Sequence, residues 1–281
     1  MTAEVVVRGL PGWHNSGLPL EKLYAKLVIE LFMIELSERK TMEIKVDAEE
    51  MLQAGLQFGH KTSRIHPKIK PYLFGARNGI NIFDLEKTSV KFREALEFIS
   101  NLIADQKTLL MVGTKVQMKN LIKTTAQECD LSYISERWLG GTFTNFETVK
   151  KRIEYFKNLE AQKKSGELEK YTKKEQSKIN KELGRLELKF GGVKDLARLP
   201  DAVFVADMKK DALCIKEARA KKIKIIAVAD TNVDPTLADW PIPANDDAIS
   251  SVKYILNKVK EVVLASKSLP AAKEEISKEE K

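Results

Sequence analysis

The chain has 281 residues, of which 43% are hydrophobic and 31% are charged, and its formal net charge is +8. This length predicts one large domain or one domain with an appendage, and the basic charge favours a polyanionic partner, either nucleic acid or an anionic membrane surface. The two distant cysteines, Cys129 and Cys214, argue against a disulfide scaffold and a zinc finger, and they fit a cytoplasmic protein.

The first 41 residues differ from the rest of the chain. Their apolar stretch at 25–36 is interrupted by charges and falls short of the ~20 residues that span a bilayer. A Glu-Arg-Lys run at 38–40 lies just before Met42, as a purine-rich ribosome-binding site would encode. We therefore expect Met42 to be the start and residues 1–41 to be a translated leader; the alternative is a disordered or genuine N-terminal extension.

From Met42 onward helical and strand patterns alternate, which predicts a parallel sheet covered by helices on both faces. The region from 55 to 77 is expected to be a loop that leads into the first strand of this sheet. Residues 42–146 and 190–266 should form a single α/β domain. The apolar spacing indicates helices at 48–54, 86–104, 115–128, 212–221 and 246–266, and strands at 79–84, 108–113, 132–134, 202–206 and 223–229.

One segment, 147–189, breaks this alternation. Narrow apolar seams on charged helices lie on either side of a Lys-Lys-Ser-Gly turn. Such seams bury little except against a partner helix, so we expect a protruding antiparallel coiled-coil hairpin inserted into the domain. The Lys/Glu-rich tail, 267–281, should be disordered. The seam residues are Phe146, Val149, Ile153 and Phe156 on the first helix, and Ile179, Leu183, Leu186 and Phe190 on the second.

A basic segment from His60 to Arg77 contains no acidic residue, and Pro67 and Pro71 stiffen it. Tyr72 and Phe74 interleave with the charges. Such a segment fits contact with an RNA backbone and stacking on bases, although a solvated basic loop would have the same composition. The candidate RNA contacts in this segment are Lys61, Arg64, Lys68, Lys70 and Arg77.

Further RNA candidates follow along the chain. Lys115 comes after a predicted strand and could touch a phosphate. In the stretch 137–146, Arg137 is basic, and Trp138 either stacks on a base or anchors the loop to the core. The first hairpin helix adds Lys150, Lys151 and Arg152.

The motifs of common catalytic sites are absent from the sequence, including a dinucleotide-binding glycine fingerprint, a phosphate-binding P-loop and a nucleophile elbow. One metal site remains conceivable. Asp207 and Asp230 each follow a predicted strand, so with His60 they could hold zinc or a similar ion. Alternatively, both carboxylates cap the turns that follow. An enzyme with a nucleotide cofactor would need a phosphate-binding turn, and a coiled-coil adaptor without RNA would leave the basic segment unexplained.

Several motifs, in order over residues 42–266, resemble the small-subunit ribosomal protein S-two family of bacterial type. They are Phe58-Gly59-His60, Pro67 to Tyr72, Phe74 to Gly79, Arg137 to Gly141, Thr144-Asn145-Phe146, Leu199-Pro200-Asp201, Asp230-Thr231-Asn232 and Pro241 to Ile249. This chain has Gln57-Phe58 where the family often has a second histidine, and Ala244 where it has glycine.

The resemblance implies a flavodoxin-like parallel sheet flanked by helices, with a protruding coiled coil. It also implies a non-enzymatic structural constituent of the small ribosomal subunit in the cytoplasm, bound to small-subunit rRNA and neighbouring proteins. Docking of ribosomal protein S-one and support of translation initiation would follow, with no membrane and no small-molecule substrate. The family's suspected metal positions match His60, Asp207 and Asp230.

Overall fold

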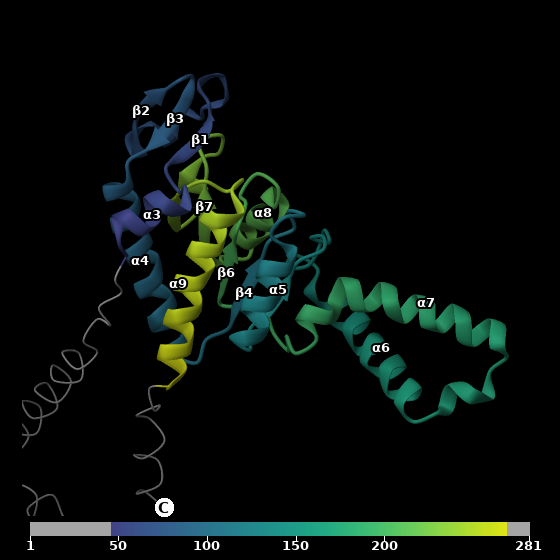
Figure 1. The fold of residues 1–281 in the computed structure, drawn as a ribbon. Coiled ribbons are helices and arrows are strands. Elements are labelled where there is room, and N and C mark those ends of the chain that lie inside the picture. The colour runs from purple at the N-terminus through teal and green to yellow at the C-terminus, as the bar shows by residue number, and fades with distance from the viewer. Residues whose placement is uncertain (1–45, 269–281) are drawn as a thin grey trace, which may run out of the picture. The chain divides into compact units, whose positions relative to one another are not determined.

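The computed structural model describes residues 46–268. The expected leader at 1–41 lies outside this range. The expected disordered tail at 267–281 also lies outside it, except that residues 267 and 268 belong to the last helix, α9 (Ile249–Ser268), which corrects the expected start of the tail. The main sheet has five parallel strands in the order β5-β4-β6-β7-β8, of which β4, β6 and β7 are labelled in Figure 1. The strands are β4 (Leu109–Val112), β5 (Ser132–Ile134), β6 (Ala202–Val205), β7 (Lys224–Ala229) and β8 (Trp240–Pro243).

The strand order confirms the predicted flavodoxin-like arrangement, because numbering these strands along the chain gives 2-1-3-4-5. The strands are nearly continuous runs of apolar residues because both faces are covered. Met111, Phe204 and Ile226 face one apolar cluster, and Leu110 and Val203 face the other. The first cluster includes α3 (Ala48–Ala54), α4 (Leu85–Ala104), α5 (Lys119–Glu128) and α9 (Ile249–Ser268), and the second includes α8 (Ala212–Ala220) and the start of the hairpin.

A second, antiparallel sheet corrects two expectations about the N-terminal part of the domain. Its order is β1-β3-β2, with β1 (Phe58–Lys61), β2 (Leu73–Arg77) and β3 (Ile80–Phe83). The predicted strand at 79–84 therefore belongs to this sheet and is not the first strand of the parallel one. The predicted loop at 55–77 contains two strands and the 3₁₀ turns η1 (Thr62–Arg64) and η2 (Pro67–Tyr72). Both strands are short, largely exposed and rich in basic residues and glycine, so they show no apolar alternation.

The segment between β5 and β6 folds as two helices that lie against each other, α6 (Phe146–Lys164) and α7 (Lys173–Phe190) (Figure 1). The turn η3 (Glu167–Lys170) connects them, and η4 (Gly191–Val193) leads back to the sheet. A capping box of Thr172 and Glu175 begins α7. Seam residues such as Ile153, Phe156 and Leu183 are buried, which is consistent with the predicted coiled-coil hairpin.

Smaller differences from the predicted elements have local causes. Strand β8 contains two prolines, and the sequence patterns did not identify it; an edge strand tolerates them because one side of its backbone needs no partner. Helix α5 begins four residues later than predicted, because the chain turns at 115–118 before the helix starts. Between residues 46 and 268, no helix is long and apolar enough to cross a membrane.

Candidate functional site

The basic strap, residues 60–77, is held against the loop that follows β7. The backbone N–H of His60 donates to Thr231 Oγ1 at 2.9 Å, and the N–H of His66 donates to the Thr231 carbonyl at 2.7 Å. The ammonium of Lys68 donates to Asp234 Oδ2 at 2.7 Å. Burial would raise the pKa of Asp234, but the Lys68 ammonium and the hydrogen bonds from Thr236 lower it to about 2. The strap is therefore a fixed element of the fold.

Four of the five candidate RNA contacts in the strap are exposed and form no ion pair with any residue in the range 46–268; they are Lys61, Arg64, Lys70 and Arg77. Lys68 is the fifth, and Asp234 already neutralises it. Phe74, on β2, is 83% exposed. The strap thus presents uncompensated positive charge together with an open aromatic ring, both of which suit an RNA strand.

The second predicted RNA stretch has a different character. Trp138 is only 6% exposed, and its ring packs edge-on against Phe143 with centroids 4.8 Å apart. Its Nε1–H donates to Glu217 Oε1 at 3.2 Å. This geometry favours the anchoring interpretation of Trp138 over base stacking. Arg137, next to it, is exposed, as are Lys150, Lys151 and Arg152 on α6.

Glu217 organises this stretch, and sequence reasoning missed it. Its carboxylate, on α8, accepts hydrogen bonds from the backbone N–H groups of Gly141, Phe143 and Thr144 at 2.8, 2.9 and 3.2 Å, and from Trp138. Burial would raise the pKa of Glu217, but these donors outweigh it and hold the pKa below its ordinary value. A single acid in a helical segment gives no sequence signal for distant backbone donors.

At the carboxyl edge of the parallel sheet, an ion-pair cluster surrounds Lys115. Its ammonium lies 2.6 Å from Asp247 Oδ1, 3.0 Å from Asp246 Oδ1 and 3.3 Å from Asp207 Oδ2. Burial would lower the pKa of Lys115, but these carboxylates raise it above its ordinary value. Ligands of open α/β sheets bind at this edge, beside the strand where the order reverses. In this protein, Lys115 is already partnered there, which limits its availability for the phosphate contact that the sequence suggested.

The three aspartates of this cluster do not share one environment. Asp246 is 2% exposed, and burial together with the carboxylates of Asp207 and Asp230 raises its pKa to about 7, against the opposing effect of Lys115. The pKa of Asp247 is lowered, because Lys115 and His60 outweigh its partial burial. Asp207 Oδ1 also accepts from the N–H groups of residues 209 and 210 at 2.8 Å, so it caps a turn.

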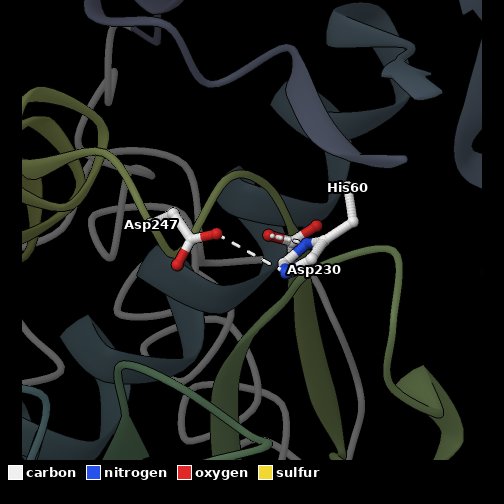
Figure 2. A group of neighbouring side chains, drawn as sticks. All are labelled: His60, Asp230 and Asp247. Carbon is white, nitrogen blue, oxygen red and sulfur yellow. Dashed lines mark ion pairs between the residues drawn. The ribbon is translucent and has the colours of Figure 1, made fainter. Parts of the chain in front are cut away.

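The predicted metal set is only partly brought together. His60 Nδ1 lies 3.1 Å from Asp230 Oδ2, a close contact that is poorly aligned for a hydrogen bond, and His60 Nε2 lies 3.5 Å from Asp247 Oδ2 (Figure 2). Asp247 thus stands where Asp207 was expected. The Asp230 carboxylate raises the pKa of His60 against the lowering effect of burial.

The fit of this set to zinc is incomplete. The three ligand atoms lie within 4.8 Å of one another, whereas two ligands at ~2.1 Å from zinc are at most ~4.2 Å apart. The two carboxylates also face different nitrogens of the His60 ring, so one ion would need a rearrangement to reach all three residues. As it stands, the arrangement suits mutual charge compensation between the histidine and the aspartates.

Comparison with known proteins agrees with the motifs. A family model described as ribosomal protein S2 matches residues 51–266. The small ribosomal subunit protein uS2 of Dictyoglomus thermophilum is 45% identical over 221 residues, which cover 79% of this chain and 90% of the relative. The protein of the same name from Dictyoglomus turgidum is 44% identical over the same shares. Both relatives are named as ribosomal proteins and not as enzymes, in agreement with the expectation of no catalytic centre. The chain belongs to the ribosomal protein S2 family.

Proposed function

We propose that this protein is a structural constituent of the small ribosomal subunit, works on the ribosome in the cytoplasm, and binds small-subunit rRNA. The family match over residues 51–266 carries the proposal. The basic strap supports the RNA contact, because its charges are exposed and its backbone is held by the loop after β7. The proposed contacts are Lys61, Arg64, Lys70, Arg77, Arg137, Lys150, Lys151 and Arg152.

The proposed mechanism is assembly by electrostatics and shape. Cationic side chains displace counterions from the rRNA backbone, so affinity should fall steeply as salt rises. Because hydrogen bonds from the backbone N–H groups of His60 and His66 anchor the strap, its backbone needs little reordering on binding. Lys68 and Lys115 contribute less in this proposal, since aspartates already neutralise them.

Co-sedimentation with small ribosomal subunits tests the proposal. The strap variant replaces Lys61, Arg64, Lys70 and Arg77 by glutamine, and we expect it to join small subunits at clearly reduced occupancy. The matched control removes the same charge at exposed lysines on helices and turns elsewhere: Lys123, Lys216, Lys221 and Lys253. Equal occupancy of the strap variant and the control would refute the assignment of the strap to RNA.

The finer part of the proposal concerns a partner protein. The resemblance to the S-two family extends the proposal to docking of ribosomal protein S-one and support of translation initiation. Small subunits assembled with and without this chain should differ in the amount of ribosomal protein S-one that they retain. Equal retention would remove this part and leave the rRNA contact standing.

A further inference from the structure

One face of α7 carries a row of basic side chains that the function proposed so far leaves unused. We call it the α7 stripe: Lys174, Lys178, Lys181, Arg185 and Lys189. Their spacing of four, three, four and four residues confines them to about 80° of the helix circumference and extends them over about 22 Å of its length. All five side chains are exposed. The stripe therefore runs along nearly the whole helix.

Among the described residues, no acidic residue of α7 forms an ion pair with the stripe. Glu175 closes the capping box with Thr172, and Glu182 accepts a hydrogen bond from the Tyr155 hydroxyl on α6. Glu187 pairs with Lys194 at 3.0 Å. Within residues 46–268, none of the five stripe residues forms an ion pair. A merely solvated helix face usually mixes both signs of charge, and this one does not.

At the sheet end of the stripe lies a cavity of about 250 Å³, lined by Glu136, Arg137, Leu139, Arg185, Leu188 and Lys189. Leu188 is 64% exposed, and its side chain and that of Leu139 give the cavity an apolar part. Glu136 is already paired with Lys119 on α5, so the three cations dominate the rim. The cavity is smaller than the ~300–1,000 Å³ of typical small-molecule sites.

We propose that the α7 stripe and this cavity bind one strand of RNA, with its phosphates along the stripe and one unstacked base in the cavity. The inference rests on the proposed rRNA binding and gives it a second, separate surface. Cations at helical spacing follow a phosphate backbone, whereas the two leucines and the flat guanidinium groups of Arg137 and Arg185 accept the face of a base. An acidic protein would share the charge but would need a longer apolar seam to bind stably.

The experiment measures binding of the full chain to a bacterial small-subunit rRNA transcript over a range of salt concentrations. The stripe variant combines Lys178→Gln, Lys181→Gln and Arg185→Gln. Its matched control combines Lys163→Gln, Lys170→Gln and Lys173→Gln, which remove the same charge from the same hairpin outside the stripe. Relative to the control, we expect the stripe variant to lower the slope of log affinity against log salt by about 2, since each single-strand phosphate contact contributes ~0.7.

The cavity is tested by Leu188→Ala, a substitution at an exposed position that should leave folding intact. We expect about tenfold weaker binding at every salt concentration with an unchanged slope, because base contact is not ionic. A stripe variant that matches its control, while the strap variant still loses binding, would overturn the inference and leave the proposed function intact. Poly-glutamate serves as the acidic-protein probe. A stripe variant that keeps its binding to the rRNA transcript and loses only its binding to poly-glutamate would also overturn the inference. No salt-dependent binding by the wild-type chain would defeat both.

Discussion

Replacing Glu217 by glutamine should destabilise the protein far more than a change of one atom suggests. The carboxylate oxygens accept five hydrogen bonds: two at Oε1, from Trp138 and Gly141, and three at Oε2, from Phe143 and Thr144. A glutamine has one carbonyl oxygen, so in either orientation its amide NH₂ faces at least two of these donors. A buried donor without an acceptor costs ~1–3 kcal/mol, which gives an expected loss of ~2–6 kcal/mol.

Urea denaturation at pH 7, followed by circular dichroism, measures this loss as a difference in the free energy of unfolding. Glu97→Gln is the matched control, because Glu97 is an exposed acid in the middle of helix α4 and should stay within ~0.5 kcal/mol of the wild type. A loss below ~1 kcal/mol for Glu217→Gln would show that the loop 137–146 finds other acceptors, and the reasoning about Glu217 would be wrong.

The same variant predicts a pH dependence with a definite sign. The folded-state pKa of Glu217 lies below its unfolded value because the ionised form receives the hydrogen bonds. Its contribution to stability is therefore complete above the unfolded pKa of ~4.3 and disappears as the pH falls through the lower folded pKa. The difference in unfolding free energy between wild type and Glu217→Gln should shrink as the pH is lowered from 5 toward 3, and a constant difference would contradict this assignment.

Two further predictions concern the strap and the ion-pair cluster. Gly59→Ala would place its Cβ 2.4 Å from Thr231 Cγ2, so we expect the free energy of unfolding in urea to fall by ~1–3 kcal/mol. Gly75→Ala meets no atom within 4 Å and should cost less than ~1 kcal/mol. Equal losses for the two variants would refute the close packing of β1. Lys115→Met leaves its partly buried aspartates uncompensated and should lower the free energy of unfolding by ~3–5 kcal/mol. Lys119→Met, which breaks the exposed pair with Glu136, should cost less than ~1 kcal/mol. Similar urea midpoints for the two variants would contradict the ion-pair cluster.

The sequence predicted the elements whose pattern is set by burial. Strands β4, β6 and β7 are apolar runs because helices cover both faces of the sheet. Such runs can be recognised in the sequence without knowing which strands lie beside them. The strands β1, β2 and β8 were missed because other demands set their composition. Gly59 in β1 allows close approach to Thr231, and Pro241 and Pro243 in β8 are tolerated only at a sheet edge, a position that the sequence does not reveal.

The candidate site was predictable where it depends on local composition. It was not predictable where side chains from distant parts of the chain meet in the fold. The exposed charges of the strap follow from a segment without acids. The choice of Asp247 over Asp207 beside His60 depends on how the chain turns after β8, and the choice of Trp138 as an anchor depends on Glu217, 79 residues away. Contacts between residues so far apart produce no hydrophobic periodicity, so sequence patterns could not reveal either of them.

The anchoring of the strap by the loop after β7 has a consequence for the order of events during synthesis. His60 leaves the ribosome early, but Thr231, which receives its N–H, is added 171 residues later. At ~5–20 residues per second, the strap waits about 10–30 s for its anchor. Until then, the charged segment lacks the hydrogen bonds that hold it to the loop after β7. A chain that stops short of β7 would carry the basic residues but not the surface, so the capacity to join a subunit should appear only when synthesis is nearly complete.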